Sequence, residues 1–204
     1  MKAPAKLVCL ESYWNERLFG TYSVKGFFEA MAPFADPPLA LAHRFVESGA
    51  GLAYYLKRPD GVMWRRKDLF DVPVYYVAFH GVPGGLSSLT GRVDADELCD
   101  AFAGYGKGGY RSLVYFACCD VLRGARGRRF AREFLKKSGA QALIGYATHV
   151  DWMASLVADL LFLQRFYADP SPWRNLRRIF ASVQRDYPRA RRLGHTLILR
   201  GDKT

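Results

Sequence analysis

The fold of this chain is decided by the run VPVYYVAFHG, residues 72–81, in which an apolar strand stops at a polar end. Residues 74–79 carry no charge and are rich in Val, Tyr and Phe, which is typical of a strand covered on both faces of a parallel sheet. Pro73 stands at the entry of the strand, where a missing N–H is tolerated. His80 and Gly81 follow at once, so an imidazole is expected at the carboxyl end of a buried strand.

A second run of the same kind, LVYFACCD at residues 113–120, ends in two adjacent thiols, Cys118 and Cys119. If the two runs are neighbouring parallel strands, their carboxyl ends meet at one edge of the sheet, and an imidazole and a thiol emerge side by side. Successive side chains of a strand point to opposite faces, so only one of the two cysteines can readily meet His80. Counting back from His80 and from Cys118 gives two matching runs, YYVAFH and LVYFAC, which favours Cys118 as the partner. Cys119 is the alternative nucleophile.

Strand-like and helical patterns alternate along the rest of the chain. Within residues 84–92, glycines flank a short alternating run, which predicts a hairpin next to the end of the His80 strand. Asp94 and Ser23 are the expected N-caps of two helices. Strands that alternate with helices predict an α/β fold, a three-layer α-β-α sandwich with a mostly parallel, six-stranded sheet. The other strands are expected at residues 5–10, 39–46, 140–148 and 195–200, and the other helices at 49–58, 126–140, 150–169 and 171–187.

The length and composition favour one domain over residues 1–204, because a chain with half of its residues hydrophobic can bury one sizeable core. No apolar run reaches the roughly 18 to 20 residues of a membrane-spanning helix. The first residues turn acidic too soon for a secretory signal, so a cytoplasmic protein without membrane contact is expected. The four cysteines are too few and too uneven for a disulfide framework. None belongs to a paired metal-ligand spacing, and neither a metal nor another cofactor is expected.

The formal charge of +11 is large for a chain of this size, and much of it lies in residues 123–137 and 173–192. Such a field attracts polyanions. Solvated arginines on helix surfaces give the same composition, however, and no nucleic-acid-binding motif is present. Nucleic-acid binding is therefore kept only as a second alternative function.

The pair of a cysteine and His80 points to nucleophilic catalysis. A thiol attacks acyl carbons only as the thiolate, and its ordinary pKa of about 8.5 leaves it mostly protonated at neutral pH. His80 could take the thiol proton and give it to the leaving amine, while N–H groups at Gly81 and at the nucleophile hold the oxyanion. Taken singly, a buried cysteine is more often a small hydrophobic residue, and a histidine at a strand end is more often just hydrogen-bonded. The conjunction at two successive strand ends favours catalysis.

These motifs resemble the caspase-like cysteine peptidases, the clan of caspases, legumains, gingipains, separases and bacterial CHAT domains. The resemblance lies in strand-His-Gly at residues 74–81, VYYVAFHG, followed by strand-Ala-Cys at residues 113–118. Residues 139–167, GAQALIGYATHVDWMASLVADLLFLQRFY, are similar to the CHAT pattern of a small-residue strand, a Val-Asp pair, a helix and a Phe-Tyr pair. The resemblance covers residues 69–167.

The resemblance implies a role for each motif residue. His80 would be the base, and Cys118 the nucleophile, because the cysteine of the family commonly follows a small residue such as Ala117. Gly81 would serve the oxyanion hole. Asp151 would lie beside the pocket for the side chain before the scissile bond, where its carboxylate would favour a basic side chain.

The resemblance also implies a fold and a function. A caspase-like sheet would begin with the strand order 2-1-3-4. The expected protein is a cysteine endopeptidase that cleaves a protein or peptide substrate through a Cys-His dyad. A regulatory partner protein is a further expectation, and bacterial relatives often act in signalling or defence.

Two departures keep alternatives open. Family members often place a small residue two or three positions after the cysteine, whereas this chain reads CCDVLRG, with Gly124 later. This favours a catalytically silent caspase-like interaction module as the first alternative. Asp151 also stands where an N-cap would start the next helix. His149 is a second candidate base, ranked below His80 because the His80 strand should adjoin the cysteine strand.

Overall fold

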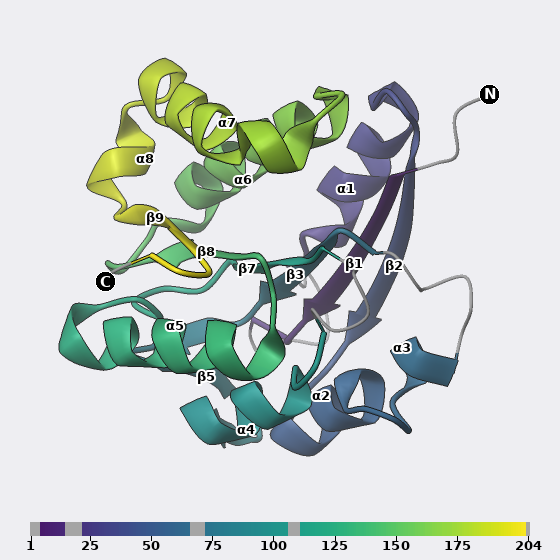
Figure 1. The fold of residues 1–204 in the computed structure, drawn as a ribbon, viewed down its shortest axis with the longest axis vertical. Helices are drawn as coiled ribbons and strands as arrows, with labels where there is room; N and C mark the ends of the chain where they lie inside the picture. The colour runs from purple at the N-terminus through teal and green to yellow at the C-terminus, as the bar shows by residue number, and fades with distance from the viewer. Residues whose placement is uncertain (1–4, 15–21, 66–71, 106–110, 203–204) are drawn as a thin grey trace.

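The computed structural model describes residues 5–14, 22–65, 72–105 and 111–202, and Figure 1 shows a sheet between two layers of helices. Within these residues the main sheet has six strands in the order β2-β1-β3-β7-β8-β9. Neighbouring strands are parallel except β8 and β9, which are antiparallel. The predicted α/β sandwich is confirmed, and so is the order of the first four strands. The strands are β1 (Ala5–Glu11), β2 (Leu39–Phe45), β3 (Val74–Ala78), β7 (Leu113–Phe116), β8 (Ala142–Tyr146) and β9 (His195–Leu199).

The central strands β3, β7 and β8 are buried along their whole length, as their uninterrupted apolar runs predict. The pairing of β3 with β7 sets Val77 opposite Phe116. Matching the runs YYVAFH and LVYFAC would set Tyr75 opposite Leu113, but Tyr75 pairs with Val114. The expected register is therefore wrong by one residue, and a shift of one residue exchanges the two faces of a strand. The pairing ends before His80, which begins the first strand of a separate small sheet.

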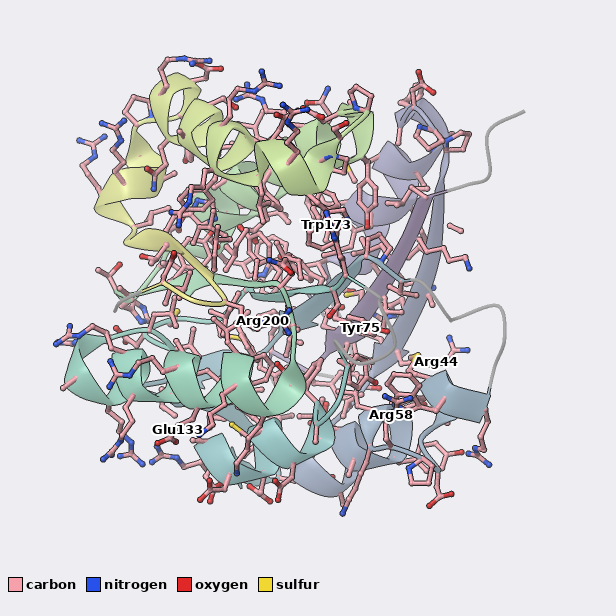
Figure 2. The ribbon with its side chains drawn as sticks, in the orientation of Figure 1. Arg44, Arg58, Tyr75, Glu133, Trp173 and Arg200 are labelled. Carbon is pink, nitrogen blue, oxygen red and sulfur yellow. The ribbon has the colours of Figure 1, made fainter. Side chains whose placement is uncertain are left out.

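Each face of the sheet is covered by one layer of helices (Figure 1). Apolar side chains fill the space between the sheet and each layer (Figure 2), and they form two buried clusters. None of the helices in the described part of the chain is long and apolar enough to cross a membrane. One layer contains α1 (Lys25–Met31), α6 (Trp152–Ala168), α7 (Pro172–Asp186) and α8 (Arg189–Arg192), and the other contains α2 (Gly49–Leu56), α3 (Val62–Arg65), α4 (Ala95–Ala101) and α5 (Gly124–Ser138).

A small antiparallel sheet follows β3 and confirms the predicted hairpin. It consists of β4 (His80–Val82), β5 (Gly85–Ser88) and β6 (Gly91–Val93). Because β4 begins at His80, this small sheet holds the backbone of the His-Gly pair.

The predicted N-cap residues each accept a backbone N–H at the start of a helix. Asp94 caps α4 and Asp151 caps α6 through their carboxylates. At the third position, the hydroxyl oxygen of Ser23 accepts a hydrogen bond from the Lys25 N–H at 3.1 Å and so caps the start of α1, although Val24 is the residue directly before the helix. The same hydroxyl donates a hydrogen bond of 2.7 Å to Glu11.

A buried polar network ties α6 to the sheet. The carboxylate of Asp159 accepts hydroxyls from three neighbouring strands, Tyr76 at 2.6 Å, Tyr115 at 2.5 Å and Tyr146 at 2.5 Å. Burial raises the pKa of Asp159 to about 6, although the tyrosine hydrogen bonds work in the opposite direction. The His195 Nε2 contacts the Tyr115 hydroxyl at 2.7 Å, and burial lowers the pKa of His195 to about 3, so the ring is neutral.

Replacing Asp159 by Asn should remove a pH dependence of stability. The pKa of Asp159 is raised from 3.8 to about 6, so the folded chain holds the proton more tightly than the unfolded chain does. The contribution to stability is complete below about pH 4 and is lost as the pH rises through about 6, amounting to about 3 kcal/mol. Urea denaturation across this range should show a stability difference between wild type and Asp159→Asn that changes by that amount. A difference that stays constant with pH would contradict the assignment.

Candidate active site

Four segments meet at the carboxyl edge of the sheet, because β1, β3, β7 and β8 run parallel. Gly81, after β3, lies against the backbone of Cys119, after β7. The Cys119 sulfur contacts Val150, after β8, and His80 contacts Trp14, after β1. The structure thus brings together the His-Gly, Cys-Cys and Val-Asp motifs, and it adds a segment after β1 that the sequence did not mark.

The contact between Gly81 and Cys119 is the closest in this group. A Cβ atom at residue 81 would lie 1.8 Å from the carbonyl oxygen of Cys119 and 2.8 Å from its nitrogen. Only glycine fits at this position, because a backbone atom cannot move aside as a flexible side chain can. The backbone of the His-Gly pair therefore packs directly on the backbone of Cys119.

The Cys119 side chain is half-buried at this edge. Its sulfur accepts a hydrogen bond from the N–H of Val150 at 3.4 Å, and its thiol points to the Val150 carbonyl at 3.7 Å. Burial raises the pKa of the Cys119 thiol, and the charge of Asp120 raises it further. The hydrogen bonding at Val150 lowers the pKa, but by less than burial raises it. The thiol therefore needs a base before it can act as a nucleophile.

Cys118 points into the core instead. Its side chain is 1% exposed, and its thiol donates a hydrogen bond of 3.2 Å to the carbonyl of Val77, inside β3. Burial raises the pKa of the Cys118 thiol far above its usual range. A nucleophilic role for Cys118 stays a prediction, and it would require the core to open.

The imidazole of His80 is exposed and is held by Trp14. Its Nε2 lies 3.1 Å from the Trp14 carbonyl oxygen, and the two rings meet edge to face with centroids 5.3 Å apart. A carbonyl can only accept, so Nε2 carries the proton and Nδ1 is the basic nitrogen of the neutral ring. The sequence offered no residue to orient His80, and a main-chain carbonyl does so.

Glu11 is a residue of this region that the sequence reading missed. Its carboxylate, at the end of β1, is completely buried and accepts four hydrogen bonds. Burial alone would raise the pKa of Glu11, but the donors together hold the pKa below its ordinary value. The only signal in the sequence is an acidic residue that directly ends an apolar strand run. The donors are His43 Nε2 at 2.7 Å, Ser23 Oγ at 2.7 Å, Trp14 Nε1 at 2.8 Å and the Val24 N–H at 2.9 Å.

The turn after Cys119 is made without a glycine at the expected position. Asp120 adopts a left-handed conformation with φ +55°, which aspartate tolerates better than most residues. Its N–H donates to the Thr148 carbonyl at 2.9 Å, and its own carbonyl accepts from the Arg123 N–H at 2.8 Å. The left-handed Gly124, at φ +62°, serves to start α5. The chain therefore turns sharply at Asp120.

Asp151 fills the capping role that its position predicts. Its Oδ1 accepts from the Ala154 N–H at 2.8 Å, and the carboxylate stays 59% exposed. Arg189 of α8 lies 4.0 Å away. His149, the lower-ranked base, is exposed on the same loop. The free side of the Asp151 carboxylate is thus shared between solvent and Arg189.

An aromatic surface adjoins this loop. Trp152 packs against Tyr22, with centroids 5.9 Å apart, and against Phe27, at 5.7 Å. Tyr22 and Met153 are 59% and 49% exposed. An exposed apolar surface therefore begins two residues after Val150, which touches the Cys119 sulfur, and such surfaces commonly receive other molecules.

No family model matches the chain, and no curated protein matches it. Within the part of the chain that the structure describes, no group of three or more His, Cys, Asp or Glu side chains is arranged to hold a metal ion.

Replacing Gly81 by Ala should disrupt the site and lower stability by about 2 kcal/mol, because the added Cβ would overlap the Cys119 carbonyl. Thermal unfolding and the rate at which an electrophile labels the half-buried Cys119 thiol are the measurements. Gly26→Ala is the matched control, since nothing lies within 4 Å of a Cβ there and alanine suits a helix. Equal behaviour of the two variants would mean that the close contact is absent.

Proposed function

We propose that this protein is a cysteine endopeptidase in which Cys119 is the nucleophile and His80 the base. The observation that carries the proposal is the packing of Gly81 on the backbone of Cys119, whose thiol is half-buried at the sheet edge. In this scheme Nδ1 of His80 takes the thiol proton, and the thiolate sulfur bonds to the carbonyl carbon of a peptide. The N–H groups of Gly81 and Cys119 are the proposed donors to the oxyanion.

The remaining steps follow from the same two groups. The protonated His80 gives its proton to the leaving amine as the C–N bond breaks, and an acyl group stays on sulfur. A water molecule that loses a proton to His80 then attacks this thioester and releases the acid. The sulfur regains its proton, so the cycle closes without a metal or a redox cofactor.

Two observations favour Cys119 over Cys118 as the nucleophile. Gly81, the residue after His80, packs on the backbone of Cys119, whereas Cys118 is buried in the apolar cluster of one helix layer. The sulfur of Cys119 also lies at the sheet edge, against Val150. The thiol of Cys118 instead donates a hydrogen bond to the Val77 carbonyl within the sheet. The sequence favoured Cys118 because it follows Ala117, and the geometry favours its neighbour.

The proposed substrate is a segment of a partner protein, in line with the expected caspase-like activity. Asp151 is the proposed partner of a basic side chain before the cut. Such a side chain would compete with Arg189 for the carboxylate, which limits the preference it can create.

A catalytically silent interaction module is the alternative that one observation favours. Burial raises the pKa of the Cys119 thiol, so without effective proton transfer to His80 the sulfur stays protonated. The two proposals differ in whether thiol reactivity depends on His80.

Nucleic-acid binding is the weaker alternative. Side chains ending in nitrogen line the outer side of α7 and α8 (Figure 2). Three of them, Arg177, Arg178 and Arg185, already contact carboxylates, which reduces the charge offered to a polyanion. Retention on a nucleic-acid column that falls steeply with salt would support this alternative.

Replacing Cys119 by Ala should abolish both peptide hydrolysis and labelling by an electrophilic acyl probe. Cys118→Ala should keep most of both and lose only about 1 kcal/mol of stability, because it deletes a buried sulfur. His80→Gln should slow labelling of Cys119 by about 10² or more, the range of a missing general base. Loss of activity in Cys118→Ala alone would return the role to that residue. Labelling that does not depend on His80 would favour the silent module.

Replacing Asp151 by Asn should raise KM for peptides with Arg or Lys before the cut and leave peptides with apolar residues there unchanged. Asparagine caps a helix as well as aspartate does, so thermal stability should stay the same. Asp151→Ala is the comparison, because it should lose the cap as well, at about 1 kcal/mol. A KM for basic peptides that is equal in wild type and Asp151→Asn would reject the pocket role.

A further inference from the structure

The connection from β1 to α1 leaves from Glu11 and returns to it. Near its start, Trp14 donates its indole N–H to Oε1 at 2.8 Å. At its end, the Val24 N–H donates to the same oxygen at 2.9 Å, and Ser23 donates to Oε2 at 2.7 Å. His43, on β2, contacts Oε2 at 2.7 Å. One buried carboxylate thus fastens both ends of the segment that carries Trp14.

The carboxylate of Glu11 has no capacity left for a substrate. An ionised carboxylate offers about four acceptor positions, and four donors occupy them here. The side chain is completely buried, so no ligand reaches it from solvent. A buried charge of this kind persists only when it is fully hydrogen-bonded. The role of Glu11 is therefore to hold its neighbours in place.

Trp14 links this carboxylate to the candidate base. Its indole is fixed on Glu11, and its carbonyl oxygen lies 3.1 Å from Nε2 of His80. The edge of one ring also meets the face of the other, at 5.3 Å between centroids. A change in the indole position would therefore move the carbonyl that selects the tautomer of His80.

We propose that Glu11 is a positioning residue that controls the protonation form of His80 through Trp14. With Trp14 fixed, Nε2 keeps the proton and Nδ1 is available to take the proton of Cys119. Without the link, the ring can carry its proton on either nitrogen or turn away. The effect on catalysis rests on the proposed peptidase function, whereas the effect on the tautomer does not depend on it. In this proposal Glu11 affects the reactivity of the site without contacting the substrate.

The test uses Trp14→Phe, which removes the indole N–H but keeps a ring and the main-chain carbonyl. Spectra of the full chain with ¹⁵N-labelled histidine, recorded above the titration range of the ring, report the tautomer of His80 directly. We expect the Nε2–H form in the wild type and a mixture or the Nδ1–H form in Trp14→Phe. The rate constant of Cys119 labelling should fall about tenfold, with little change in the concentration at which the probe saturates. The Glu11→Gln variant, provided that it folds, should change the His80 tautomer and the Cys119 labelling rate in the same direction.

The matched control is Trp64→Phe, because the indole of Trp64 also donates a hydrogen bond to a main-chain carbonyl, that of Leu56 at 2.7 Å. It lies in the opposite helix layer and should leave the tautomer of His80 unchanged. An unchanged tautomer in Trp14→Phe, or an equal change in Trp64→Phe, would overturn the proposal. If the wild type neither hydrolyses peptides nor reacts with the probe, the peptidase function fails. In that case the tautomer of His80 still tests the positioning role of Glu11.

Discussion

The parallel pairing of β3 with β7 is the constraint on which the rest of this molecule depends. Both strands are buried on both faces, so their register cannot slip without exchanging every side chain between the two helix layers. The register that sets Tyr76 beside Tyr115 directs both hydroxyls to Asp159. Beyond the ends of the same strands, it brings Gly81 against Cys119. One choice of register thus fixes both the polar network within one layer and the thiol at the sheet edge.

Two buried carboxylates show how the number and kind of donors decide the charge of an acid. Asp159 accepts three neutral hydroxyls, and burial still raises its pKa. Glu11 is as deeply buried, yet four donors, one of them the His43 imidazole, lower its pKa. The transfer of a carboxylate out of water is costly in both cases, and the donors compensate for it fully only at Glu11. The acid whose pKa is lowered, Glu11, is the one that lies next to the candidate site.

Much of the fold could be predicted from the sequence, because local sequence patterns mark where its strands, helices and turns lie. The hairpin after His80 and the caps at Asp94 and Asp151 are confirmed. The order of the first four strands, which the resemblance implied, is confirmed as well. The register of β3 and β7 was off by one residue, since equal apolar runs do not mark where pairing begins. That error, together with the position of Cys118 after Ala117, favoured Cys118 over its neighbour. Glu11 was missed because its donors come from segments far apart in the sequence, and a strand-ending acid looks like a solvated one.

The two adjacent cysteines face opposite layers, and this bears on how the site would respond to oxidants. A half-buried thiol such as Cys119 can be oxidised to a sulfenic acid, which a second thiol nearby normally reduces by forming a disulfide. Cys118 cannot serve in this way, because its thiol is buried and donates a hydrogen bond to the Val77 carbonyl of β3. Cys9 and Cys99 are buried in separate cores. Recovery of oxidised Cys119 therefore depends on a thiol from another molecule, which couples the state of this site to the reducing power of its surroundings.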